Sequence, residues 1–150
     1  MSNFVLGIDF GSDSVRCLVV DAADGREVAT AVRYYPRWMR GEYCSAAENR
    51  YRHHPLDYIE SLEGAICEAL SFAGEDVAAS VKGIALDATA STVAIVDKKG
   101  TPLALREEYA ENPDAMFVLW KDHTAIDEAD RIKALAKEWH TDYTKYCGDT

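Results

Sequence analysis

The chain has 150 residues, of which 48% are hydrophobic and 28% charged, and its 16 basic and 26 acidic residues give a formal net charge of −10. This balance predicts a globular domain with a real core. The acidity argues against a nucleic-acid partner or an anionic membrane surface, because both require a basic face. No run approaches the roughly 20 apolar residues of a membrane span, and Met1–Asn3 leads at once into a predicted strand, without a signal-peptide pattern.

Three apolar runs at the start of the chain predict an antiparallel meander. They are Phe4–Phe10, Val15–Asp21 and Arg26–Tyr35. The last two are joined by an Asp-Gly turn at residues 21–25, a strong hairpin signal. In the third run, every second residue is predicted to lie on the same face of the strand. That set is Val28, Thr30, Val32 and Tyr34.

The segment of residues 36–54 is polar and aromatic without a clear period, so we expect a long functional or interface loop. A helix is predicted to begin at Pro55, because proline suits the first helical position, and to end near Gly74. Apolar residues repeat through it at helical spacing. They are Ile59, Leu62, Ile66, Ala69 and Leu70.

Further strands are predicted at residues 81–87, 92–97 and 115–120, with a tight turn at 98–100 and irregular chain at 104–113. A helix is expected from about Thr124 to Trp139. Its predicted apolar face consists of Ile126, Ala129, Ile132, Leu135 and Ala136.

The four cysteines, at positions 17, 44, 67 and 147, form no C-x-x-C pair. Cys17 and Cys67 fall within apolar patterns, which predicts small core residues. This usage predicts a reduced protein located in the cytoplasm.

Residues Gly7–Arg16, GIDFGSDSVR, contain the most informative motif. Asp9 ends a predicted strand, and the four residues Gly11–Ser14 (the phosphate turn) follow it with a glycine and two hydroxyls. Backbone N–H groups in such a turn can approach phosphates, and a carboxylate can hold Mg²⁺ through its waters. The alternative is an ordinary hairpin turn, because short glycine motifs often occur without function.

The order of three antiparallel strands, a helix and a strand resembles the ribonuclease-H-like unit of actin-like ATPases. Within that superfamily the sequence resembles the N-terminal part of FGGY-family carbohydrate kinases. Four blocks carry the resemblance: Gly7–Arg16 (GIDFGSDSVR), Tyr51–Glu60 (YRHHPLDYIE), Gly83–Thr92 (GIALDATAST) and Ala110–Thr124 (AENPDAMFVLWKDHT). The resemblance implies an α/β fold, namely a partial ribonuclease-H-like domain with a three-stranded antiparallel meander, a helix, further strands and a helix. It covers residues 1–150 as an incomplete first kinase domain.

The resemblance also implies ATP-dependent phosphorylation of a ketopentose, with L-ribulose to L-ribulose 5-phosphate the first expectation. Xylulose, ribitol or another pentose or pentitol as substrate, and a non-catalytic actin-like interaction module, are the alternatives. The general-base Asp and a second domain are expected beyond Thr150, so that residues 1–150 alone should be inactive. We further expect a homo-oligomer or pairing with the missing C-terminal half, since an incomplete sheet exposes an edge.

By position, the resemblance implies that Asp9 binds the magnesium and that the phosphate turn and Arg16 bind the ATP phosphates. The phosphate turn comprises Gly11, Ser12, Asp13 and Ser14. For Asp13 we expect a backbone contact at most, because an inward carboxylate would repel phosphate. The alternative for Arg16 is that it is an exposed strand residue and does not contact phosphate.

Two further segments match the sugar-binding positions of the family. The first is the sugar loop, made of Thr89, Ala90, Ser91 and Thr92, and the second is the Trp120 segment, made of Trp120, Lys121 and Asp122. Small residues leave room for a sugar, and an indole face can stack on its C–H surface. The alternatives are a plain turn for the first, and a buried tryptophan with an aspartate helix cap for the second.

Overall fold

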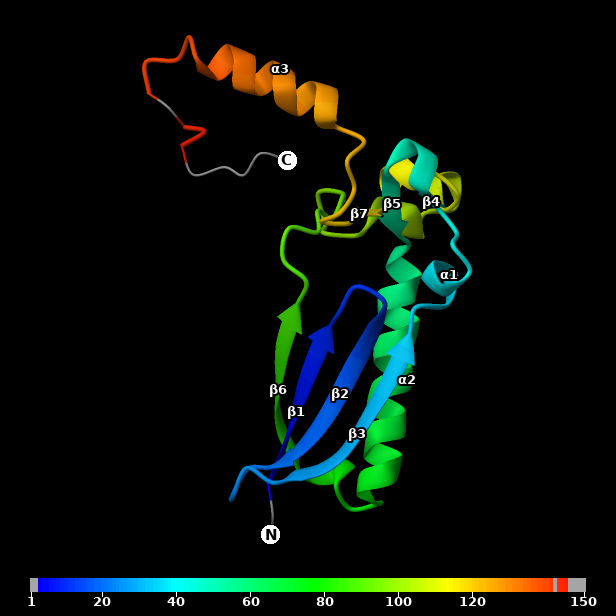
Figure 1. Ribbon diagram of the computed structural model, residues 1–150. Coiled ribbons are helices and arrows are strands. Elements are labelled where there is room, and N and C mark those ends of the chain that lie inside the picture. Colours follow the sequence, from blue (N-terminus) through cyan, green and yellow to red (C-terminus); the bar gives the residue numbers. More distant parts are fainter. Residues whose placement is uncertain (1–2, 142, 146–150) are drawn as a thin grey trace.

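In the computed structural model, which describes residues 3–141 and 143–145, a four-stranded sheet packs against one long helix (Figure 1). The strands are β1 (Phe4–Phe10), β2 (Ser14–Asp21), β3 (Glu27–Tyr34) and β6 (Val81–Ala88), in the order β3-β2-β1-β6. β1 pairs antiparallel with β2 and parallel with β6. Helix α2 (Pro55–Ala73) lies along one face of this sheet. The predicted α/β class and meander are confirmed.

The core lies between the sheet and α2. Alternate residues of each strand point to opposite faces, and the inward positions Leu6 and Ile8 of β1 and Val15, Cys17 and Val19 of β2 are at most 3% exposed. Each fully buried apolar side chain stabilises the fold by roughly 1.5–3 kcal/mol. On β3 the inward face carries Ala31, while the opposite set with Val32 and Tyr34 is exposed.

Helix α2 begins and ends as the sequence predicts. His54 caps its first turn, because Nδ1 accepts a hydrogen bond from the Leu56 N–H at 3.1 Å. Pro55 suits the first helical position, because an N–H there would have no partner within the helix. Gly74 ends the helix with φ 110°, a conformation that suits glycine. Ala65 and Ala69 are fully buried against the sheet, whereas Ile59 is 41% exposed, so the buried stripe is rotated from the predicted one.

Residues 36–54 are more ordered than the predicted loop. They contain helix α1 (Pro36–Met39) and strands β4 (Cys44–Ser45) and β5 (Arg50–His53). β5 pairs with β4 and with β7 (Phe117–Val118), forming a small second sheet above the main one (Figure 1). The pairing of β5 with β7 joins segments some 65 residues apart in the chain, and such long-range contacts leave no period in the local sequence.

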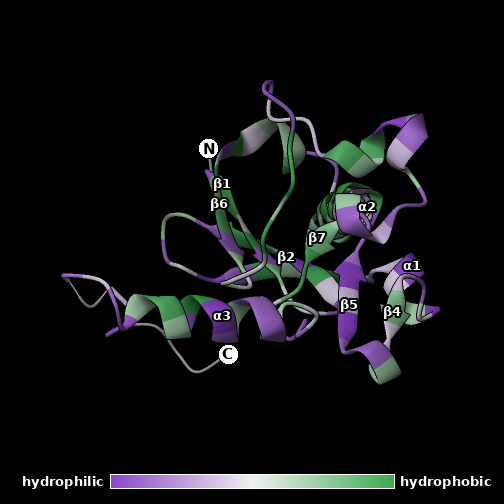
Figure 2. Ribbon diagram, turned by 90° about the horizontal axis from the view of Figure 1, so that it is seen from above, coloured by the Kyte–Doolittle hydropathy of each residue, from purple (hydrophilic) through white to green (hydrophobic). Residues whose placement is uncertain are grey.

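The later predicted elements are shorter than expected. Residues 92–97 form only two isolated bridges, Val93 with Val118 and Val96 with Pro102, instead of a strand. The strand predicted at 115–120 is reduced to β7. Helix α3 (Ile126–Ala136) extends away from the sheet (Figure 1), and hydrophobic and hydrophilic residues both occur along it (Figure 2). Short 3₁₀ turns cover Ala46–Glu48, Ala78–Ser80, Leu103–Leu105, Glu107–Tyr109 and Pro113–Ala115.

Two apolar surfaces are uncovered. The edge strand β6 exposes Ile84 at 59% and Leu86 at 69%, and α3 exposes Ile132 and Leu135 about half. Cys67 is exposed, because it lies on the face of α2 turned away from the sheet, so its predicted core position is wrong. Cys17 is buried as predicted. Cys147 lies outside the described residues. Within the described chain, no helix combines the length and apolarity that crossing a bilayer requires.

Candidate active site

The phosphate turn connects the end of β1 to the start of β2. The N–H of Gly11 donates to the carbonyl oxygen of Ser14 at 2.9 Å, and a Cβ at position 11 would lie 3.3 Å from that oxygen, so the turn is tight. The side chain of Asp13 accepts a bond from the Ser14 hydroxyl at 2.8 Å. Among residues 3–141 and 143–145, the backbone N–H groups of Ser12 and Asp13 have no acceptor. Two adjacent N–H groups without partners form a site that suits an anion.

Asp9 and Arg16 lie next to this turn, on the sheet face turned away from α2. They are register partners on β1 and β2, and their side chains pair at 2.9 Å while remaining 43% and 57% exposed. Asp87 is the register partner of Asp9 on β6. All three line an open pocket of about 510 Å³ on this face. An exposed ion pair is worth only about 0–1 kcal/mol, so Arg16 can leave Asp9 for a phosphate at little cost.

The residues present fit a magnesium ion that arrives with a nucleotide. Mg²⁺ is commonly held by one or two carboxylates together with substrate phosphates and water. Asp9 offers a half-exposed carboxylate at the end of a strand, beside the free N–H groups of the phosphate turn. No cluster of three or more metal-ligating side chains occurs in the part of the chain that the structure describes. This arrangement suits an ion bound with its phosphates rather than a closed protein cage.

The sugar loop begins where β6 ends, close to the end of β1. The N–H and the hydroxyl of Thr89 both donate to the carbonyl oxygen of Phe10, each at 2.9 Å. Ala90 is exposed, and the hydroxyl oxygen of Thr92 is buried without a hydrogen-bond partner among the described residues. The loop is therefore joined to the strand that carries Asp9 and the phosphate turn.

Ser91 has φ 60°, in the left-handed region that non-glycine residues avoid. We expect Ser91→Gly to raise the free energy of unfolding by about 0.5–1 kcal/mol, because relief of roughly 1–2 kcal/mol of strain exceeds the extra chain entropy of roughly 0.5–1 kcal/mol. Urea unfolding measures this difference. The matched control is Ala90→Gly, which should be destabilising because Ala90 is not in that region; equal effects of the two changes would disprove the strain.

The Trp120 segment follows β7 and reaches back to the phosphate turn. Trp120 is 53% exposed, and its indole Nε1–H donates to the hydroxyl oxygen of Ser12 at 3.2 Å. The ammonium of Lys121 lies over the rings of Trp38 and Tyr51, 4.8 and 4.3 Å from their centroids, which is cation–π geometry. The structure thus brings the phosphate turn, the sugar loop and the Trp120 segment to one end of the sheet.

Asp122 differs from its two neighbours because its carboxylate is buried and fully engaged. One oxygen accepts from the Tyr51 N–H and from Arg52 Nε, each at 2.8 Å, and the other accepts from the backbone and hydroxyl of Thr124. Burial acts to raise the pKa of Asp122, but the hydrogen bonds from Thr124, Tyr51 and Arg52 outweigh it and hold the pKa below its usual range. With a side chain only 2% exposed, Asp122 fixes the backbone of the segment.

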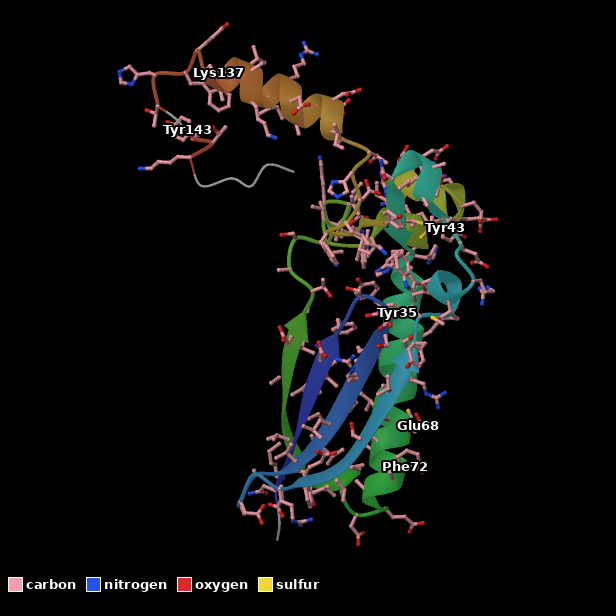
Figure 3. The ribbon with its side chains drawn as sticks, in the orientation of Figure 1. Tyr35, Tyr43, Glu68, Phe72, Lys137 and Tyr143 are labelled. Carbon is pink, nitrogen blue, oxygen red and sulfur yellow. The ribbon has the colours of Figure 1, made fainter. Side chains whose placement is uncertain are left out.

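An aromatic cluster supports the phosphate turn from below. Tyr35, fully buried where the main sheet meets the upper elements (Figure 3), donates its hydroxyl to the carbonyl oxygen of Gly11 at 3.1 Å. Its backbone N–H donates to the carbonyl oxygen of Asp13 at 2.9 Å. The Tyr35 ring stacks on Tyr58 and meets His53 edge-on. The sequence pattern did not indicate this supporting role, because it marked Tyr35 only as the last residue of the third predicted strand.

His53 is fully buried in this cluster, with Nδ1 3.0 Å from the Tyr58 hydroxyl. The pKa of His53 is lowered to about 4. Burial is the main cause, the carboxylate of Asp57 offsets part of the shift, and the positive charge of Lys121 adds to it. Because the folded pKa lies below the usual 6.5, neutral His53 stabilises the fold above pH 6.5, and this contribution is lost as the pH falls toward 4.

At roughly 1.4 kcal/mol per pKa unit, protonation of His53 lowers the free energy of unfolding by about 3 kcal/mol between pH 6.5 and 4. We expect the free energy of unfolding of the wild type to fall between pH 6.5 and 4 by about that much more than that of His53→Phe, which cannot titrate. Urea unfolding across this pH range measures the difference. Parallel pH profiles for the two proteins would show that His53 does not titrate on unfolding.

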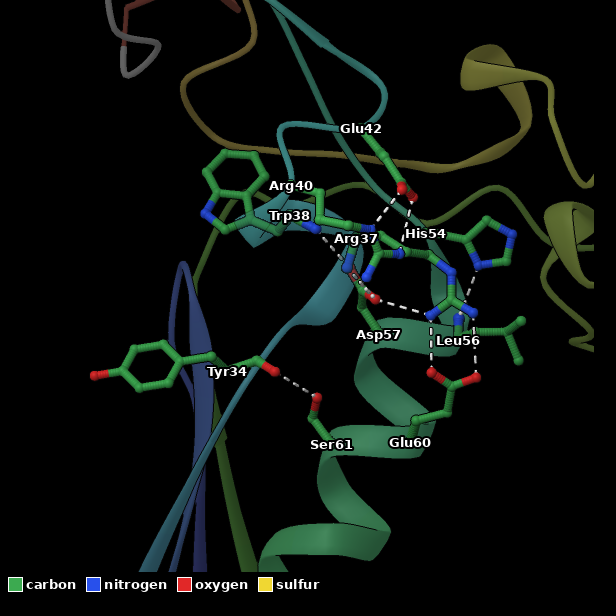
Figure 4. A network of polar contacts seen from close by, with 10 residues as sticks. All are labelled: Tyr34, Arg37, Trp38, Arg40, Glu42, His54, Leu56, Asp57, Glu60 and Ser61. Atoms are coloured by element: carbon green, nitrogen blue, oxygen red, sulfur yellow. Dashed lines mark hydrogen bonds and ion pairs between the residues drawn. The ribbon is translucent and has the colours of Figure 1, made fainter.

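A second polar network fixes α1 against the start of α2 (Figure 4). The carboxylate of Asp57, which is fully buried, accepts bonds from the backbone N–H groups of Arg37 and Trp38, each at 3.1 Å, and from the Arg37 guanidinium at 2.9 Å. Glu60 binds the same guanidinium at 2.8 Å. Because Trp38 contacts Lys121 and His53, this network positions one wall of the aromatic cluster.

Known proteins resemble this chain in sequence and in fold. No protein-family model matches it. A ribulokinase of Vibrio parahaemolyticus is 53% identical over 145 residues, which cover 96% of this chain and 26% of that protein. A ribulokinase of Halalkalibacterium halodurans is 34% identical over 142 residues, covering 91% and 25%. The chain therefore spans about a quarter of the length of these curated relatives.

The fold matches that of solved sugar kinases. A gluconate kinase from Lactobacillus acidophilus superposes with a TM-score of 0.66 at 13% identity, over 92% of this chain and 24% of that one. A ligand-bound xylulose kinase from the same organism gives a TM-score of 0.65 at 13% identity, over 91% and 24%. These matches confirm the predicted ribonuclease-H-like, actin-like ATPase fold and its partial extent.

Proposed function

We propose that this chain belongs to the FGGY family of sugar kinases and forms one wall of a kinase active site. It matches a ribulokinase of Vibrio parahaemolyticus along 96% of its own length, and its fold matches that of a solved sugar kinase. The reaction proposed is ATP-dependent phosphorylation of L-ribulose to L-ribulose 5-phosphate by an intact protein that contains residues 1–150 as part of its first domain. The observation that carries the proposal is the convergence of the phosphate turn, the sugar loop and Trp120 at one end of the sheet.

In this proposal the phosphate turn and Asp9 receive the nucleotide. The free N–H groups of Ser12 and Asp13 bind phosphate oxygens, and Arg16 leaves Asp9 to neutralise their charge. Magnesium, when bound with the nucleotide beside Asp9, supplies charge neutralisation for phosphoryl transfer. The side chain of Asp13 stays turned to the Ser14 hydroxyl, so only its backbone contacts the anion.

The sugar lies against the sugar loop and the Trp120 segment. The exposed indole of Trp120 supplies a stacking face, and Lys121, Ser91 and Thr92 supply polar groups for hydroxyl oxygens. Asp122, whose oxygens are already engaged, acts by holding the segment in place. The general base and the adenosine pocket are proposed to come from the second domain, and closure of the two domains excludes water and so favours transfer to the sugar.

A cytoplasmic location is part of the proposal, because the three cysteines in the described chain are free thiols and the reaction consumes ATP. The exposed β6 edge is proposed to be covered in the intact protein, by its own remaining chain or by a second copy.

A substrate panel on the intact gene product tests this function. ADP release is measured in the presence of Mg²⁺ and ATP, with L-ribulose, xylulose or ribitol as the substrate and with a sugar-free blank. We expect the highest kcat/KM with L-ribulose. Preference for xylulose or ribitol would transfer the proposal to that substrate, and absence of sugar-dependent ADP release with every compound would favour the non-catalytic module.

A further inference from the structure

Two hydrogen-bonded connections join the sugar side of the site to the nucleotide side. Thr89 of the sugar loop binds the carbonyl oxygen of Phe10 twice, at 2.9 Å from its N–H and from its hydroxyl. Trp120 binds the Ser12 hydroxyl at 3.2 Å, across 108 residues of sequence. Because Phe10 and Ser12 flank Gly11, both connections end at the beginning of the phosphate turn.

Trp120 has a fixed backbone and an exposed ring. The residue before it, Leu119, is 2% exposed and donates its N–H to the carbonyl oxygen of Tyr51 at 3.2 Å. Lys121, the residue after it, lies over two aromatic rings. The ring of Trp120 itself is 53% exposed, and its bond to Ser12 is the one hydrogen bond of the indole among the described residues. The ring orientation and the position of Ser12 therefore depend on each other.

We propose that Trp120 is a positioning residue that couples sugar binding to nucleotide binding through the Trp120–Ser12 hydrogen bond; this inference rests on the proposed function. A sugar that packs on the indole fixes the ring, and the fixed N–H holds Ser12 and orders the phosphate turn. The nucleotide then binds a turn that is already ordered, so its binding loses less conformational entropy. The coupling is reciprocal, because each ligand changes the affinity of the other by the same factor.

The test measures that factor in the intact gene product. The Kd of a non-hydrolysable ATP analogue with Mg²⁺ is determined without sugar and with saturating L-ribulose, for the wild type, Trp120→Phe, Ser12→Ala and the double variant. Phenylalanine keeps an aromatic face for the sugar but lacks the N–H donor. Ser12→Ala removes the acceptor without touching the sugar side. Trp139→Phe, the same change at a tryptophan beyond α3, is the matched control.

We expect L-ribulose to tighten analogue binding in the wild type and in Trp139→Phe by roughly five- to 150-fold, the usual range of coupling between sites. Each single variant should reduce that factor several-fold, and the double variant should reduce it no further, because both changes break one bond. A factor of one in the wild type, an unchanged factor in Ser12→Ala, or strictly additive losses would overturn the inference.

The experiment separates this inference from the function on which it rests. Normal phosphorylation of L-ribulose together with an unchanged factor in the variants refutes only the coupling. Failure of the wild type to bind or phosphorylate any sugar refutes the proposed function, and the coupling with it. Ser12→Ala also keeps the test decisive if Trp120→Phe does not fold.

Discussion

Asp9→Asn is expected to lower the proposed kinase turnover of the intact gene product by roughly 100-fold or more, the usual cost of removing one group that stabilises charge in a transition state. Asparagine keeps the shape of the side chain but loses the charge that is proposed to hold magnesium beside the phosphate turn. The fold should persist, since Asp9 is 43% exposed and its ion pair with Arg16 is partly solvated. The measurement is kcat with saturating L-ribulose and Mg²⁺–ATP.

Asp24→Asn provides the matched control, because Asp24 is an exposed carboxylate in the turn between β2 and β3, at the other end of the strands. Its turnover should equal that of the wild type. Unchanged turnover in Asp9→Asn, with a normal melting transition, would remove Asp9 from the nucleotide site and favour the interaction-module alternative.

Arg52→Met is expected to lower the free energy of unfolding by about 3–5 kcal/mol, the usual cost of leaving one charge of a buried pair without its partner. Arg52 and Asp122 are 7% and 2% exposed, and their side chains meet at 2.8 Å. Methionine fills much of the same volume but leaves the Asp122 carboxylate buried without its counter-charge. Urea unfolding of the two proteins gives the difference.

Two further variants define what this measurement reports. Arg40→Met breaks a shorter ion pair, 2.6 Å from Glu42, that lies on the surface, and it should leave the free energy of unfolding nearly unchanged. Arg52→Met combined with Asp122→Leu should recover part of the loss, because no unpaired charge remains. Equal effects of Arg52→Met and Arg40→Met would show that the buried pair does not anchor the Trp120 segment.

The main sheet and α2 were predictable because their signals are local. Short apolar runs define β1 and β2, and the Asp-Gly turn marks the hairpin from β2 to β3. His54-Pro55 and Gly74 mark the two ends of α2. These features act within a few residues of chain, where one sequence is sufficient.

The upper elements were not predictable in the same way. β5 exists as a strand because it pairs with β4 and β7. Residues 92–97 do not form a strand, because among the described residues they pair only through isolated bridges to Val118 and Pro102. For α3 the local pattern did predict the helix, but it did not indicate that the predicted apolar face is about half exposed at Ile132 and Leu135. In each case a tertiary neighbour, present or absent, decides the structure that the local pattern left open.

The candidate site shows the same division. The glycine turn and Asp9 were visible in the sequence, and the family resemblance indicated the sugar loop and Trp120. The side chains that hold these groups were not visible: the Tyr35 hydroxyl on Gly11, the buried His53, and the engagement of Asp122 by Arg52. Support of this kind depends on which side chains the fold brings together, and no sequence spacing encodes it.

A crystal structure of the intact gene product with Mg²⁺, a non-hydrolysable ATP analogue and L-ribulose tests the central claim most directly. We expect the terminal phosphates to accept hydrogen bonds from the N–H groups of Ser12 and Asp13, with the metal beside Asp9 and the sugar against the Trp120 indole. Phosphates bound away from the phosphate turn, or a sugar without contact to Trp120 and the sugar loop, would contradict the account.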